Sequence, residues 1–130
     1  MIKPLLLLLT MLLSLWAGSI QEDKDFQSAI GSMGKKDKLV LMIYTTDGCP
    51  ECAYMKEKVF HDKIVEPYMR DNFVVIEKNV HKSELPDGYD FFGIPTMFFI
   101  DKMGNKKATI IGSKRAQAFL DEITRIRGQK

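Results

Sequence analysis

Three short, largely apolar runs constrain the fold of this chain more than any other feature of its sequence. They are Leu39–Tyr44, Phe73–Ile76 and Thr96–Ile100. Their length favours strands buried inside a sheet over helices. A fourth run, Ala108–Ile111, follows the third after a Gly-containing stretch that reads as a hairpin turn. We therefore expect a central sheet built from these four strands.

The segments between these runs carry helical signals. Apolar residues at helical spacing from Phe26 to Met33 predict a short helix that ends near Gly34, and the same spacing predicts a closing helix near the C-terminus, with Ser113 as its N-cap. Another helix is expected to start at Pro50, and residues 62–71 to continue it, broken or kinked at Pro67. The order predicts an α/β fold in which a βαβ unit is followed by ββα. The central mixed sheet is then flanked by helices on both faces.

The N-terminus has the pattern of a secretory signal peptide. Lys3 gives a short positive start, Leu5–Trp16 is the apolar middle, and the small residues 17–19 come before a polar run. We expect residues 1–19 to be removed and residues 20–130 to form one domain. A retained membrane anchor is the alternative, because the apolar run is only slightly shorter than the roughly 20 residues that span a bilayer.

Composition and motifs exclude several functions. The 130 residues carry a formal net charge of +2, which is too weak a field to indicate a nucleic-acid partner. Phosphate-binding loops of the GxxxxGK[ST] or GxGxxG type are absent from the sequence. Two cysteines and two histidines are too few for a multi-ligand metal cage. We expect no cofactor and no resident metal, although a simple two-thiol metal site stays open.

The chemistry is concentrated in Cys49-Pro50-Glu51-Cys52, which holds both cysteines of the chain. Residues three apart on a helix have Cβ atoms roughly 5–6 Å apart, so a disulfide can close across one turn. The motif lies at the start of a helix, whose N-terminus stabilises a thiolate. Cys49 is therefore expected to be the exposed nucleophile and Cys52 the resolving thiol. So short a loop gains little stability from a disulfide, which makes a purely structural bridge the weaker interpretation.

A second signal is Gly93-Ile94-Pro95-Thr96, at the start of the third strand. A proline that enters a buried strand removes a hydrogen-bond donor from the ladder, so its presence there needs a special reason. The simpler interpretation is a proline that ends a turn and starts a strand.

Taken together, these motifs resemble the thioredoxin family. A CxxC after the first core strand, Ile-Pro-Thr before the third, and a Gly followed by a closing helix span about residues 36–127. The resemblance implies a thioredoxin-like fold in which the peptide bond before Pro95 is cis. It also implies that Pro95, with Ile94 and Thr96 beside it, lies against the disulfide and receives the cysteine segment of the substrate.

One stretch is similar to a particular branch of that family, and two positions depart from the family pattern. The run Cys52–Phe60 followed by Asp62 resembles the periplasmic branch, which includes SoxW-type thioredoxins and the C-terminal domain of DsbD. The family usually has Trp where this chain has Gly48, and a buried acid where it has Ile43. The groups left for proton transfer to and from Cys52 are Glu51, Asp47, another carboxylate or water.

We therefore expect a periplasmic thiol:disulfide oxidoreductase that reduces protein disulfides. Glu51 places a negative charge between the two sulfurs and opposes the thiolate, and Pro50 supplies no cation, so both residues modulate the pair towards the reducing direction. The implied partners are client proteins with disulfides and a membrane electron donor of the DsbD or CcdA type. The protein is expected to be a monomer.

Other functions of the same motif remain open at this point. The pair could serve an oxidase or an isomerase of the same fold. It could also belong to a non-catalytic module that uses the two thiols to bind a metal or a partner. The sequence does not identify the client protein either, which could belong to cytochrome c maturation, to sulphur oxidation or to general repair of disulfides.

Overall fold

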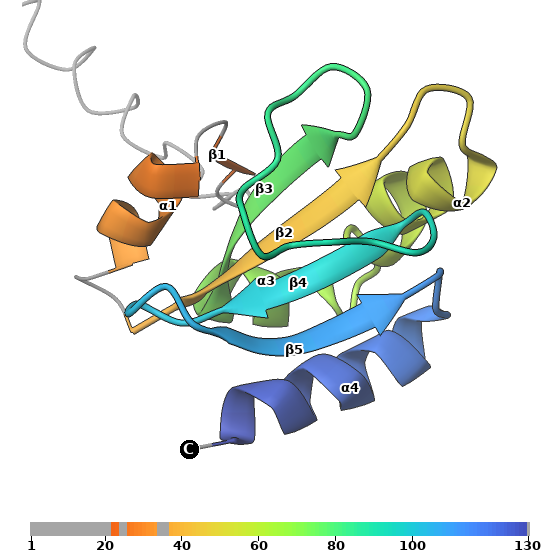
Figure 1. Ribbon diagram of the computed structural model, residues 1–130. Coiled ribbons are helices and arrows are strands. Elements are labelled where there is room, and N and C mark those ends of the chain that lie inside the picture. Colours follow the sequence, from red (N-terminus) through yellow and green to blue (C-terminus); the bar gives the residue numbers. More distant parts are fainter. Residues whose placement is uncertain (1–21, 24–25, 34–36, 130) are drawn as a thin grey trace, which may run out of the picture.

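The computed structural model describes residues 22–23, 26–33 and 37–129, so the expected signal peptide lies outside the described residues. The sheet has the order β1-β3-β2-β4-β5 (Figure 1). Its strands are β1 Glu22–Asp23, β2 Leu39–Thr45, β3 Phe73–Asn79, β4 Thr96–Ile100 and β5 Lys106–Ile111. Strand β3 is parallel to β1 and β2, whereas β4 is antiparallel to β2 and β5. The predicted mixed sheet is confirmed, and β1 is an edge strand that its two-residue length hid from the sequence pattern.

Helices cover both faces of this sheet, as predicted. They are α1 Phe26–Met33, α2 Pro50–Ala53, the π-helix η1 Tyr54–Val59, α3 Glu66–Asn72 and α4 Ala116–Gly128. Ala29 of α1 belongs to the core on one face, and η1, α3 and α4 supply buried residues to the core on the other (Figure 1). Among the described residues, no helix is long and apolar enough to cross a membrane.

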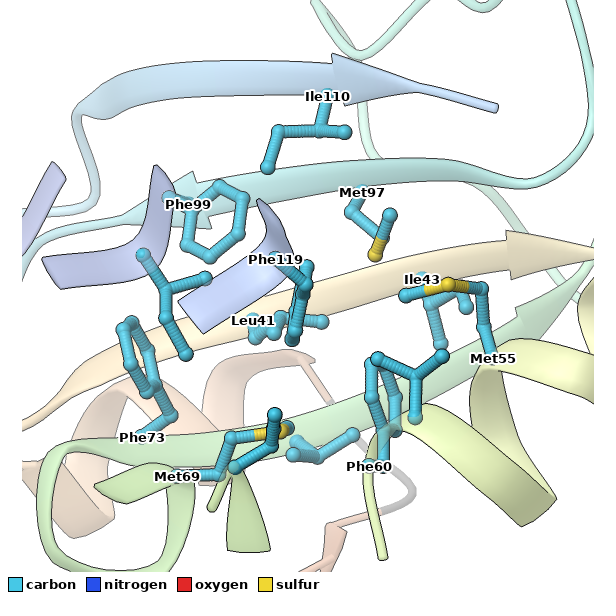
Figure 2. Close-up of a cluster of buried hydrophobic side chains, with 14 of the residues drawn as sticks. Leu41, Ile43, Met55, Phe60, Met69, Phe73, Met97, Phe99, Ile110 and Phe119 are labelled. Atoms are coloured by element: carbon cyan, nitrogen blue, oxygen red, sulfur yellow. The ribbon is translucent and has the colours of Figure 1, made fainter. Parts of the chain in front are cut away.

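The larger core lies between the sheet and the helices η1, α3 and α4, and η1 directly continues α2. Alternate residues of β2, Leu41 and Ile43, point into it together with Phe99 of β4, as the two-residue period of a strand requires (Figure 2). Residues of the covering helices complete this core, and Met55 of η1 and Phe119 of α4 are both fully buried in it. The core therefore packs the helix that carries the CxxC onto the active-site end of β2.

Two local predictions about the helices need correction. Residues 60–65 form turns, so the helical segment that starts at Pro50 is broken before Pro67 and not continued over residues 62–71, and Pro67 lies in the first turn of the separate helix α3. A first-turn proline costs no backbone hydrogen bond, so that position suits it. Ser113 does not cap α4: the N-cap is Arg115, and the Ser113 hydroxyl donates to the Glu51 carboxylate instead.

Tyr44 places a polar hydroxyl group inside the smaller apolar core, on the α1 face. Its ring is fully buried and lies edge-on to Phe91 and Phe98. Its hydroxyl has no hydrogen-bond partner in the part of the chain that the structure describes. Burial, with smaller contributions from Tyr89 and Asp90, raises the pKa of Tyr44 from 10.0 to about 12. The folded protein therefore resists ionisation of this phenol.

Replacing Tyr44 by phenylalanine is expected to stabilise the protein by about 1 kcal/mol at pH 7, because an unsatisfied buried hydroxyl is removed. In the wild type, the stability associated with neutral Tyr44 is fully present below pH 10 and is lost as the pH rises towards about 12, since the unfolded chain ionises first. The advantage of Tyr44→Phe should therefore widen in that window. Urea denaturation of both proteins from pH 8 to 11.5 measures it, and an advantage that does not grow with pH contradicts the prediction.

Candidate active site

The two cysteines are joined in a disulfide at the start of α2. Their Cα atoms are 5.3 Å apart. Cys49 is the N-cap residue of the helix, and its sulfur accepts a hydrogen bond of 3.2 Å from the backbone N–H of Cys52. Cys52 is only 2% exposed, whereas Cys49 is partly exposed. The pair thus presents one sulfur to the surface and keeps the other beneath it.

The backbone around the motif explains how β2 passes into this helix. Gly48 has φ +68°, a left-handed conformation that side-chain-bearing residues rarely adopt. Cys49 is extended, and Pro50 then occupies the first turn of α2 without wasting a hydrogen-bond donor. Glycine at position 48 is therefore required by the turn, which gives a physical reason for the departure from the tryptophan of the family.

Glu51 faces away from the sheet towards the loop after β5. The Ser113 hydroxyl donates a hydrogen bond to its carboxylate. Pro50, Glu51 and Ser113 line a surface hollow together with Tyr54, Lys114 and Arg115. Glu51, which lies between the two cysteines in the sequence, is thus tied to a neighbouring loop by a contact that the sequence pattern did not indicate.

The segment Gly93–Thr96 lies at the same end of the sheet as the CxxC. The Ile94–Pro95 peptide bond is cis. Thr96 pairs with Tyr44 across β2 and β4, so Pro95 adjoins the end of β2 from which the CxxC loop departs (Figure 1). The Pro95 carbonyl accepts from the Gly112 N–H at 2.8 Å, and the Thr96 hydroxyl donates to the Gly93 carbonyl at 2.6 Å. Pro95 and Thr96 are buried, and Ile94 packs partly buried against the α1-side core.

A hollow of about 460 Å³ opens beside the disulfide, on the side of β3. Both cysteines line it, together with the end of β2, the loop before α2, and two residues of β3, Glu77 and Asn79. Charged residues from the loop and η1 also line it, namely Asp47, Lys56 and Glu57. In the described part of the chain, no group of three or more His, Cys, Asp or Glu side chains is placed to hold a metal ion.

Two ion pairs order the charges around this hollow. Lys82 lies 2.6 Å from the Asp47 carboxylate, and with Asn79 it lowers the pKa of Asp47. Lys56 lies 2.7 Å from Glu77 Oε1, the same oxygen that accepts a 2.8 Å hydrogen bond from Thr45. The apolar run of the second predicted strand ends at Ile76, so the sequence pattern did not indicate Glu77. This residue continues the alternation of Phe73 and Val75 on the same face of the sheet.

The family model for the thioredoxin-like domain matches residues 26–127. A thioredoxin-like chloroplast protein of rice, HCF164, is 31% identical over 88 residues, which cover 66% of this chain and 33% of that protein. This chain therefore spans about a third of the length of that relative.

Solved structures share the fold. A putative disulphide-isomerase of Bacteroides thetaiotaomicron has a TM-score of 0.71 at 24% identity, covering 86% of this chain and 94% of the other. The reduced DsbD C-terminal domain of Neisseria meningitidis has a TM-score of 0.62 at 22% identity, covering 76% and 91%. At these identities the two likenesses show the fold alone.

Proposed function

Because the chain belongs to the thioredoxin-like family and carries its CxxC disulfide, we propose that it is a reductase of protein disulfides acting in the periplasm. The observation that carries the proposal is the unequal placement of the two sulfurs. Cys49 is partly exposed at the helix start, while Cys52 is buried beneath it. An exposed attacking thiol and a shielded second thiol are what a two-step exchange needs.

The reaction starts from the reduced pair. The Cys49 thiolate, stabilised by the helix N-terminus, attacks one sulfur of a client disulfide, and the other client sulfur leaves as a thiolate. Cys52 then loses its proton and attacks the Cys49 sulfur. The bond between Cys49 and the client sulfur breaks, the second client sulfur leaves as a thiolate, and the Cys49–Cys52 disulfide forms. The client has gained two electrons from the cysteine pair, and its two thiolates take up protons from solvent.

The roles of the flanking residues follow from their positions. Pro95 and Thr96 lie at the end of the sheet that holds the disulfide, and an extended client segment could run alongside them, with Ile94 at the edge. Pro50 and Glu51 separate the two cysteines in the sequence, and Glu51 adds a negative charge to the first turn of the helix. That charge disfavours the thiolate and so favours a reducing couple.

Location and electron supply complete the proposal. The sequence pattern of residues 1–19 supports export, and the resemblance of the run Cys52–Phe60 to the periplasmic branch of the family supports a periplasmic thiol pathway. A reducing dithiol in an oxidising compartment needs a source of electrons, so a membrane donor of the DsbD or CcdA type is the expected partner.

The reduction potential tests the direction of electron flow. The full chain is expressed in a bacterial host, recovered from the periplasmic fraction, weighed by mass spectrometry for loss of residues 1–19, and equilibrated with glutathione buffers. The expected potential lies nearer to about −270 mV, as in thioredoxin, than to the oxidising end near −120 mV. A value near the oxidising end would replace the reductase with an oxidase. Recovery in the cytosol with residues 1–19 intact would remove the periplasmic assignment.

A further inference from the structure

The proposed reaction requires a proton to leave a thiol that the fold shields. Cys52 is 2% exposed, and burial in apolar surroundings disfavours its thiolate. Directly beneath the helix, β2 presents Ile43, which is fully buried and cannot take a proton. A base for Cys52 must therefore reach it from the hollow beside the disulfide.

The hollow is large and polar enough to hold water molecules that can transfer a proton. Its volume of about 460 Å³ is many times the roughly 30 Å³ that one molecule occupies in liquid water, and its lining is rich in polar groups. Cys52 lines it from the helix side and Glu77 from the sheet side. Water in this space can connect the two groups without direct contact between them.

Glu77 is positioned by the sheet and by two hydrogen bonds. It is the register partner of Ile43 in the β2–β3 pair, so its side chain lies on the sheet face that α2 and η1 cover. Its Oε1 accepts from the Thr45 hydroxyl at 2.8 Å and from Lys56 Nζ at 2.7 Å. Lys56 follows Cys52 by one turn of the same helical segment. The carboxylate is therefore held at the rim of the space that Cys52 faces.

The other acidic groups of the hollow are less suited to this role. Asp47 is more exposed than Glu77, with 70% against 44% of the side chain accessible, and Lys82 and Asn79 lower its pKa and make it a weaker base. His81 is exposed and does not line the hollow. Glu57 is exposed, and no hydrogen bond or ion pair holds it among the described residues.

We propose that Glu77 accepts, through water in this hollow, the proton that Cys52 releases when it resolves the mixed disulfide. The S–H bond of Cys52 breaks, and the proton passes to the Glu77 carboxylate. The Cys52 sulfur bonds to the Cys49 sulfur, and the bond from Cys49 to the client sulfur breaks. The client leaves as a thiolate and takes up a proton from solvent. Lys56 and Thr45 orient the carboxylate, and the same relay returns the proton when the disulfide is reduced.

A stopped-flow reaction of the reduced chain with 5,5′-dithiobis(2-nitrobenzoate) isolates this step. The first coloured thiolate reports attack by Cys49, and the second reports resolution by Cys52, with a leaving group that needs no proton. In Glu77→Gln the second phase is expected to slow about 100-fold at pH 7, the lower end of what a positioned general base contributes, and to recover as the pH rises. The first phase is the internal control.

The pKa of Cys52 separates a proton relay from a simple charge effect. The ¹³Cβ chemical shift of Cys52 in the reduced protein measures this pKa. The pKa of Cys52 should fall in Glu77→Gln, because a neighbouring negative charge is removed. If the Cys52 thiol is more acidic than in the wild type and still resolves the mixed disulfide more slowly, the variant has lost a proton acceptor. Glu77→Asp keeps a carboxylate and should restore part of the rate. Glu57→Gln, the matched change in the same hollow, should keep the wild-type second phase.

Several outcomes overturn the relay. One is an unchanged second phase in Glu77→Gln. Another is a faster phase that follows the lowered pKa, and a third is slowing in Glu57→Gln instead. The relay rests on the proposed function, and the two fail differently. A wild-type chain with no second phase would remove both, whereas normal wild-type exchange that Glu77→Gln does not alter would remove the relay alone.

Discussion

Replacing Cys52 by serine is expected to leave client proteins covalently attached to Cys49. The partly exposed Cys49 can still attack a disulfide from its position at the helix start. Without the second thiol, nothing within the chain resolves the mixed disulfide, so turnover stops at the first step. Non-reducing electrophoresis of cell extracts should show bands of higher mass that disappear on reduction.

The matched variant Cys49→Ser is the control for this experiment. It keeps a thiol at position 52, but that thiol is 2% exposed and cannot reach a folded client. We expect no trapped clients with Cys49→Ser, and loss of disulfide reduction with either variant. Trapping through Cys49→Ser in place of Cys52→Ser would reverse the assigned roles of the two sulfurs.

Replacing Phe99 by alanine is expected to lower the free energy of unfolding by about 3–5 kcal/mol. Phe99 of β4 is fully buried, pairs with Leu41 of β2, and meets the Phe73 ring edge-on at 5.7 Å between centroids (Figure 2). Strands on both sides hold the surrounding backbone, so the cavity cannot collapse. Such a loss is a large share of the roughly 5–15 kcal/mol that stabilises a typical domain.

Phe92→Ala provides a matched control, because it truncates the same side chain in the same molecule. Phe92 is 93% exposed, so its removal should change stability by less than about 0.5 kcal/mol. Urea denaturation of the oxidised proteins measures both variants. A Phe99→Ala protein with wild-type stability would mean that the Phe99 side chain is not packed in the core between the sheet and the helices.

Local patterns were enough to predict most of the fold. The strand over Thr96–Ile100 has the predicted bounds, and the helix over Phe26–Met33 ends next to the predicted end near Gly34, since apolar run length and helical spacing are properties of neighbouring residues. Strand β3 extends to Asn79, beyond the apolar run, because backbone pairing with β2 continues where the side chains turn polar. The two-residue strand β1 forms by pairing with β3, which no local pattern reveals.

By itself, the sequence determined the position of the disulfide and the class of fold. A strand, a glycine turn and a helix-starting proline bring Cys49 and Cys52 together within four residues, so local geometry suffices. Only the tertiary structure decided what surrounds them. Glu77 meets Lys56 across 21 residues, and Ser113 meets Glu51 across 62. Contacts over such separations depend on strand order and register, which arise from packing the whole chain and from no single segment of it.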